Sequence, residues 1–189
     1  MNTRIINNPL VAIISLLVVL AVGFLQVYFM GPAILPVDAG LVIAWIVWIS
    51  SGFNTIRASN KMIALYCAGI FVQLAHFGEE YFTGFQREFP MLMSGYMWDD
   101  RRFLIFNFSW IGAFILSVFG IQRGFSPAYL IAWFFVLVGE IANGILHPLL
   151  CLYTNGYFPG LFTSVSHLVI GFLLLKEFRK NLFTSAVRY

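Results

Sequence analysis

Six apolar stretches, each long enough to cross a lipid bilayer as a helix, constrain this chain more than any other feature. They cover about residues 9–30, 37–53, 62–83, 103–122, 127–150 and 159–176. The hydrocarbon core of a bilayer is about 30 Å thick and takes about 20 residues of α-helix. Within it, a helix satisfies all of its own backbone hydrogen bonds. We therefore predict an all-α polytopic membrane protein, a six-helix bundle forming one domain over residues 1–189.

The overall composition indicates the same class of protein. Hydrophobic residues make up 60% of the chain and charged residues 10%, whereas soluble domains have about 45–50% and about 25%. The net charge is only +3, and the basic residues lie between the predicted spans and near the end of the chain. This distribution gives no reason to expect nucleic acid as a partner. The expected partner is the lipid bilayer.

The positions of lysine and arginine predict the orientation of the bundle. One side carries eight of the eleven basic residues: Arg4, Arg57, Lys61, Arg123, Lys176, Arg179, Lys180 and Arg188. The other side carries three, Arg87, Arg101 and Arg102, all between the third and fourth spans. Cytoplasmic loops are enriched in lysine and arginine. We therefore predict that both termini are cytoplasmic, in a plasma membrane of the bacterial type.

Six histidine and acidic residues lie inside the predicted spans, at least three residues from either end of a span. They are all three histidines and three of the eight acidic residues: His76, His147, His167, Glu79, Glu80 and Glu140. Such groups cost about 2.5–3.5 kcal/mol each on insertion scales, so they face the protein interior and mark functional sites. At a rise of about 1.5 Å per residue, all of them lie within roughly 5–15 Å of the outer membrane face. We expect one shared site in the outer half of the bilayer.

The spacing of the polar residues places them on common helix faces. Each of the third, fifth and sixth spans carries one set at helical spacing: His76, Glu79 and Glu80; Glu140, Asn143 and His147; Thr163 and His167. Side chains three, four or seven residues apart lie on the same side of a helix. The rest of each span is mainly leucine, isoleucine, valine and phenylalanine. Each helix is therefore expected to direct one polar stripe into the bundle.

Three imidazoles and three carboxylates can ligate one divalent metal ion fully, or two ions sparingly. The predicted metal ligands are His76, Glu80, Glu140, His147 and His167, and zinc is the expected ion. A catalytic zinc takes three protein ligands and leaves a position for water, whose pKa falls to about 7. Glu79 or Glu80 can then move the proton, and Asn143 can orient a ligand or a polarised carbonyl.

Other interpretations of the same residues stay open. Buried polar residues also hydrogen-bond membrane helices to one another, at about 0.6 kcal/mol each, although acids are a costly way to do so. A metal-free protein can use intramembrane glutamate and histidine for proton transfer, as a lipid isomerase or a small proton-coupled transporter. The chain shows no inverted repeat of the kind that many transporters have. A non-catalytic sensor for a metal or a lipid is a further alternative.

Three short motifs in the second half of the chain resemble those of a known family. His76-Phe-Gly-Glu79-Glu80 resembles the signature of the HXXEE family of integral membrane proteins. Asn143-Gly-Ile-Leu-His147 fits N-x-x-x-H, and the segment from Tyr157 to Thr163 fits Y-x-P-G-x-x-T. The resemblance implies a membrane-bound, metal-dependent hydrolase. Glu140 and His167 lie outside these motifs, so their roles depend on the residue pattern alone.

The third motif also has a physical interpretation. A hydroxyl of Tyr157 or Thr163 can donate to negative charge that develops near a metal. Pro159 and Gly160 can set the start of the sixth helix. The candidate catalytic residues are thus Glu79, Glu80, Asn143, Tyr157 and Thr163. We expect hydrolysis of an amphipathic or lipid substrate by a metal-activated water, with the substrate arriving laterally or from the outer surface. The bond cleaved and the oligomeric state are not predicted.

Overall fold

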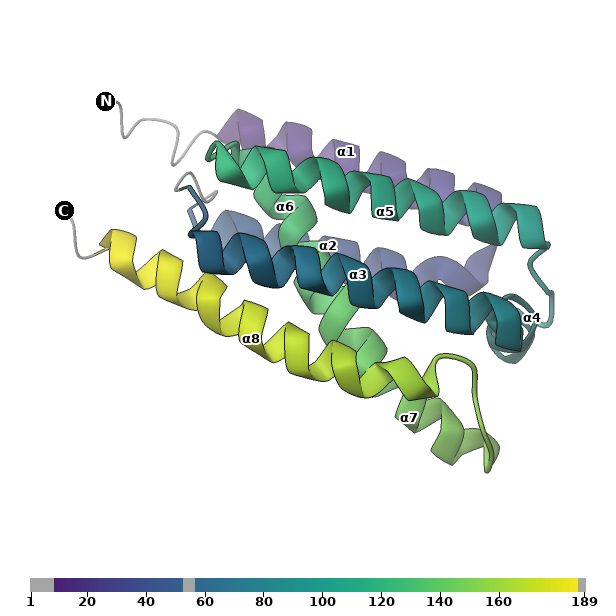
Figure 1. The fold of residues 1–189 in the computed structure, drawn as a ribbon. Coiled ribbons are helices and arrows are strands. Elements are labelled where there is room, and N and C mark those ends of the chain that lie inside the picture. Colours follow the sequence, from purple (N-terminus) through teal and green to yellow (C-terminus); the bar gives the residue numbers. More distant parts are fainter. Residues whose placement is uncertain (1–8, 53–56, 187–189) are drawn as a thin grey trace.

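The protein is a bundle of long helices (Figure 1). The structure, a computed structural model, describes residues 9–52 and 57–186, and within these ranges it has no β-strand. The helices of the first half are α1 (Pro9–Met30), η2 (Pro32–Ile34), α2 (Leu35–Ser50), α3 (Asn60–Thr83) and α4 (Phe85–Ser94). Those of the second half are α5 (Asp100–Gln122), α6 (Ser126–Phe134), η3 (Phe135–Ala142), α7 (Asn143–Thr154) and α8 (Leu161–Ala186).

Six helical segments in the described ranges are long and apolar enough to cross a membrane. They are Pro9–Met30, Pro32–Ser50, Asn60–Thr83, Asp100–Gln122, Ser126–Thr154 and Leu161–Lys180. The fifth of these is built from α6, η3 and α7 in succession. This result confirms the all-α fold with six spans that the sequence predicts.

The start of the second span and the connection after the third differ from the prediction. Pro36, expected to lie outside the second span, is inside α2, which runs from Leu35 to Ser50 instead of over residues 37–53. Proline is tolerated there because the first turn of a helix leaves its N–H groups unbonded. The polar connection after the third span contains an additional helix, α4, with Phe85 and Phe89 buried and Arg87 and Glu88 exposed.

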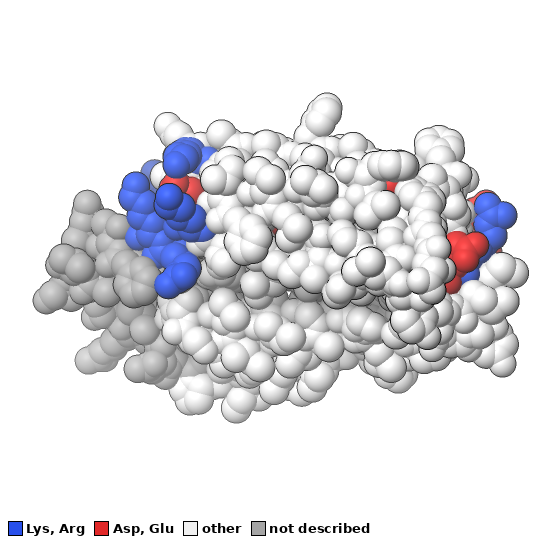
Figure 2. Space-filling view, turned by 90° about the horizontal axis from the view of Figure 1, so that it is seen from below, with Lys and Arg blue, Asp and Glu red and all other residues white. Residues whose placement is uncertain are grey.

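The outer surface suits a bilayer between two aqueous ends. On the face in Figure 2, lysine and arginine gather at the two ends, and the broad band between them is mostly uncharged. Large apolar side chains are exposed along the spans, among them Phe24, Phe71, Leu116 and Val165. The beginning of α1 and the end of α8 lie at the same end of the bundle (Figure 1). The molecule is therefore an integral membrane protein.

Small residues let the helices that carry the polar residues approach one another. A Cβ on Gly69 of α3 would lie 2.8 Å from Oε1 of Glu140 in η3. A Cβ on Gly144 of α7 would lie 2.5 Å from Cγ of Leu168 in α8. Close backbone approach at small residues is typical of helix packing in membranes. These two glycines bring α3, the fifth span and α8 together around one buried region.

The π-helix η3 interrupts the fifth span and contains the first of its polar residues, Glu140. Its hydrogen bonds run from residue i to i+5, so it turns the residues before it relative to those after it. Glu140 lies in η3, whereas Asn143 and His147 lie in the regular helix α7. The common stripe predicted for these three residues is thus divided. Single π turns in α-helices occur frequently at functional sites.

Candidate metal centre

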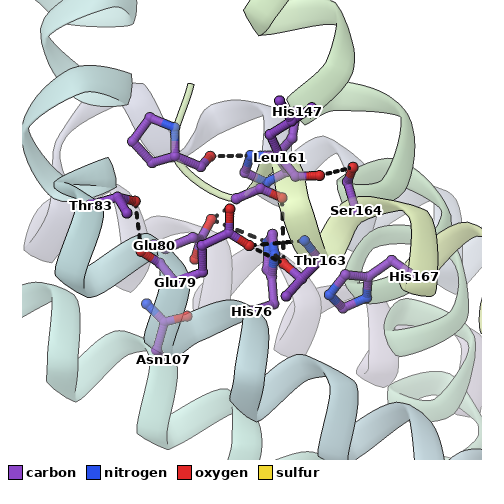
Figure 3. Close-up of polar contacts among 12 residues, drawn as sticks. His76, Glu79, Glu80, Thr83, Asn107, His147, Leu161, Thr163, Ser164 and His167 are labelled. Atoms are coloured by element: carbon purple, nitrogen blue, oxygen red, sulfur yellow. Dashed lines mark hydrogen bonds and ion pairs between the residues drawn. The ribbon is translucent and has the colours of Figure 1, made fainter. Parts of the chain in front are cut away.

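Two histidines and one carboxylate converge in the interior, near the end of the bundle opposite the start of α1 (Figures 1 and 3). His76 and Glu80 come from successive turns of α3, and His147 comes from α7. Oε1 of Glu80 lies 3.4 Å from Nε2 of His76 and 3.5 Å from Nε2 of His147. One ligand atom from each residue lies within 4.8 Å of the others, as metal binding requires. Three of the five predicted metal ligands therefore lie at one site.

The proton on His147 can be assigned from its surroundings. Its Nδ1 lies 2.5 Å from the carbonyl oxygen of Pro159. A carbonyl can only accept, so Nδ1 carries the proton in the neutral ring and donates it. Nε2 then presents a lone pair towards Glu80. A backbone carbonyl that fixes the tautomer in this way is a common partner of metal-binding histidine.

The proton on His76 is fixed through a chain of two hydrogen bonds. The Thr163 hydroxyl donates to Oε2 of Glu79 at 2.7 Å. Its single proton is thereby used, so it can only accept from Nδ1 of His76, which lies 2.6 Å away. Nδ1 of His76 therefore carries the proton, and its Nε2 presents a lone pair as well.

Three acceptor atoms consequently face one another in a buried place. Among the described residues, neither Nε2 of His76 nor Nε2 of His147 has a hydrogen-bond partner. Both histidines are 0% exposed and Glu80 is 6% exposed. Leaving a buried acceptor unsatisfied costs about 1–3 kcal/mol. A bound cation would remove that cost for the two nitrogens, and two imidazoles with one carboxylate suit a divalent metal such as zinc.

Glu79 has a different environment from its neighbour Glu80. Its Oε1 accepts from the Tyr157 hydroxyl and from the Phe162 backbone N–H, both at 2.9 Å. Its Oε2 accepts from the N–H of Thr163 at 2.9 Å and from the Thr163 hydroxyl. Glu79 thus caps the first turn of α8, where free N–H groups and the helix dipole favour a carboxylate. It joins α8 to α3 and holds Thr163 against His76.

The backbone conformation and the close contacts of residue 160 explain why a glycine precedes α8. Its φ is +93°, a conformation that L side chains rarely adopt. A Cβ there would meet both the Cε1 and the Nδ1 of His147, and it would lie 2.7 Å from Cε1 of His76. The glycine therefore allows the chain before α8 to lie directly against both imidazoles. The sequence predicted a role for Gly160 in starting the helix, but not this contact.

Glu140 and His167 form a second buried pair beside the first group. Nδ1 of His167 lies 3.0 Å from Oε2 of Glu140, and both residues are 0% exposed. The ring of His167 packs edge-on against that of His76, with centroids 4.5 Å apart. Among the described residues, Nε2 of His167 has no hydrogen-bond partner. This pair lies outside the group of three, and its part in metal binding stays a prediction.

Asn143 lies on the wall of a cavity that reaches the metal group. The cavity has a volume of about 430 Å³, and Glu80 contributes to the same wall. Gln73 and Asn107 also line it, and Asn107 is drawn with the cluster in Figure 3. The sequence did not predict Asn107 as a site residue. An amide inside an apolar span was the signal for such a role.

The fold and the site together define a helical integral membrane protein with a buried His76–Glu80–His147 group that can hold a metal ion. Comparison with known proteins gives no assignment beyond that class. No family model, no curated protein and no solved structure was found to match the chain.

Proposed function

We propose that the protein is a membrane-embedded, metal-dependent hydrolase that acts on an amphipathic or lipid substrate. One observation carries the proposal. The Nε2 atoms of His76 and His147, neither of which has a hydrogen-bond partner among the described residues, and a carboxylate oxygen of Glu80 lie within 4.8 Å of one another. Catalytic zinc sites use three protein ligands, among them sets of two histidines and one glutamate. A bound zinc ion would supply a water of lowered pKa and would polarise the substrate carbonyl.

The other polar residues have separate roles in this proposal. The Nδ1–H of His167 donates a hydrogen bond to Glu140. Its free Nε2 accepts a proton from the attacking water. The water oxygen bonds to the carbonyl carbon, and the bond from that carbon to the leaving oxygen or nitrogen breaks. His167 then returns the proton to the leaving atom, which balances the reaction. Asn143 on the cavity wall donates an N–H to the carbonyl oxygen.

Tyr157, Thr163 and Glu79 act as positioning residues. The sequence suggested that the hydroxyls of Tyr157 and Thr163 donate to developing charge, but both are bonded to Glu79. Through Thr163, Glu79 sets the ring of His76. Outer partners of this kind typically change metal affinity or activity by about 10–100-fold.

We also propose membership of the HXXEE family and a site in the outer half of a bacterial-type plasma membrane. The family proposal is supported by contacts that join the three motifs. Glu79 of the first bonds Thr163 of the third, and His147 of the second bonds Pro159 of the third. The location is supported by the excess of basic residues at the end of the bundle away from the group, which includes Lys61, Arg123 and Lys176.

Metal content and turnover of the purified protein test the proposal. Wild-type protein should bind about one zinc ion per chain, and His76→Ala and His147→Ala should each abolish that binding. Zinc-loaded protein should hydrolyse members of a panel of lipid esters and amides. Absence of specific zinc binding would favour the metal-free proton-transfer alternative. Zinc binding without turnover of any panel member would favour the sensor.

A further inference from the structure

The cavity beside Glu80 is apolar over most of its wall. Aromatic rings lie at both of its ends, with Phe89 and Trp98 towards α4, and Phe114 and Phe134 farther into the bundle. Its volume of about 430 Å³ falls in the usual range for small-molecule sites, roughly 300–1,000 Å³. An apolar cavity that reaches a buried carboxylate is suited to an apolar ligand with one polar group.

The cavity opens sideways, towards the region where lipid would surround the bundle. Three residues of α2, Pro36, Ala39 and Ile43, line the cavity and are exposed. Ile43 is 54% exposed. Because α2 is one of the six spans, this opening lies within the depth of the membrane. A ligand can therefore pass from the bilayer into the cavity without crossing water.

The length of the cavity corresponds to one lipid chain. On α5 its wall extends from Phe103 to Phe114, which is about 16 Å at about 1.5 Å per residue. One leaflet supplies about half of the 30 Å hydrocarbon core, or about 15 Å. A single acyl chain thus fits along the cavity.

Polar side chains form a band along this apolar wall that is about 10 Å long, the rise of α3 from Gln73 to Glu80 at about 1.5 Å per residue. Among the described lining residues, Gln73, Glu80, Asn107 and Asn143 carry amide or carboxylate groups. The indole N–H of Trp98 is already bonded to the carbonyl of Met30. Asn107 lies between Phe103 and Phe114 on α5, so hydrocarbon can extend on either side of the band. The ligand should therefore carry its polar group within its length.

The side-chain oxygen of Gln73 indicates the chemical class of that polar group. It is 7% exposed, and among the described residues its Oε1 has no hydrogen-bond partner. A secondary amide offers an N–H for this acceptor and a carbonyl for the amide N–H groups of Asn143 or Asn107. An ester offers the carbonyl alone, and Oε1 of Gln73 would stay unsatisfied.

We infer that the cavity binds an N-acyl amide lipid, with one fatty acyl chain along the apolar wall and its amide at the band of Gln73, Glu80, Asn107 and Asn143. The cleavage of this ligand rests on the proposed hydrolase function, whereas its binding does not. If it is cleaved, hydroxyl joins the acyl carbon, the C–N bond breaks and the amine takes the proton. The products are a fatty acid and an amine.

Quenching of tryptophan fluorescence tests the inference, because Trp98 and Trp110 line the cavity. The probe is an N-acyl ethanolamine whose acyl chain carries two bromine atoms, added to metal-free wild-type protein in detergent so that it is not cleaved. We expect saturable quenching that unbrominated N-acyl ethanolamine reverses. The brominated methyl ester of the same acid should bind about tenfold more weakly, since a buried acceptor left unpaired costs about 1–3 kcal/mol.

Two variants and one control locate the binding. Ala142→Phe fills the cavity and should remove saturable quenching, whereas Ala75→Phe on the exposed side of α3 should leave it unchanged. Gln73→Leu should abolish the preference for amide over ester, even if Ala142→Phe does not fold. The inference is overturned if wild-type quenching never saturates, if folded Ala142→Phe binds like wild type, or if wild type binds both probes equally. If the amide binds but zinc-loaded protein does not turn it over, only the hydrolase proposal is contradicted. If other lipids are turned over but the amide does not bind, only this inference is contradicted.

Discussion

The hydroxyl of Thr163 donates a hydrogen bond of 2.7 Å to the carboxylate of Glu79, and this bond joins the start of α8 to α3. The same hydroxyl has one acceptor function left, and it faces Nδ1 of His76. The bond therefore does two things. It caps a transmembrane helix, and it decides which nitrogen of a buried histidine is free to bind a metal.

Thr163→Val tests this second role. Valine keeps the shape of threonine but removes the acceptor for Nδ1 of His76, so the ring loses its preferred tautomer and orientation. We expect zinc affinity to fall by about 10–100-fold, measured by competition with a chromophoric chelator. Thr154→Val is the matched control, since within the described part of the chain that hydroxyl bonds only to the carbonyl of Leu150 in its own helix. Equal zinc affinities in the two variants would contradict the assigned role.

Glu79→Gln should affect both stability and the metal site. The glutamine has one acceptor oxygen in place of two and no charge at the start of α8, so one of the bonded groups there is left unpaired. We expect a lower midpoint of thermal unfolding and about tenfold weaker zinc binding. Glu88→Gln on the exposed side of α4 is the control and should leave zinc affinity unchanged. A Glu79→Gln protein with wild-type zinc affinity and lost turnover would instead identify Glu79 as a direct proton carrier.

Gly160→Ala should damage the centre although it adds a single methyl group. The new Cβ would overlap the His147 ring and approach His76, at a backbone φ of +93°. Strain of this kind costs on the order of 1–3 kcal/mol, and relief requires the two rings to move apart. We expect loss of zinc binding at micromolar zinc, by equilibrium dialysis. Gly78→Ala is the control, because a Cβ there meets nothing within 4 Å among the described residues. Retained zinc binding in Gly160→Ala would show that the rings are not held from this side.

His167→Ala separates proton transfer from metal binding. If His167 accepts the proton of the water, the variant keeps its zinc and loses turnover by about 10²–10⁴-fold. His76→Ala, in contrast, loses both. Zinc content by mass spectrometry and single-turnover hydrolysis give the two quantities. Loss of zinc in His167→Ala would instead make it a metal ligand, as the sequence alone suggested.

The features that follow from bilayer physics could be predicted from the sequence. Bilayer thickness dictates the length of a span, so six apolar stretches gave six helices. His76 and Glu80 are four residues apart on one helix, and their meeting follows from helical geometry. His147 was predicted to join them because it lies at a similar depth on another span, and it does so.

The remaining features depend on tertiary contacts that no local pattern contains. Glu79 shares a face with Glu80, yet it bonds the start of α8 because free N–H groups are available there. Glu140 lies in the π-helix η3, outside the regular helix that carries His147, and it contacts His167. The carbonyl of Pro159, which sets the tautomer of His147, carries no sequence signal at all.

X-ray absorption at the zinc edge, on purified protein supplied with one equivalent of zinc, tests the central claim most directly. The account predicts nitrogen or oxygen ligands at about 2.0–2.2 Å with the outer-shell scattering of two imidazole rings, and loss of one ring's contribution in His147→Ala. Zinc ligated without imidazole, or spectra identical in wild type and His147→Ala, would contradict it.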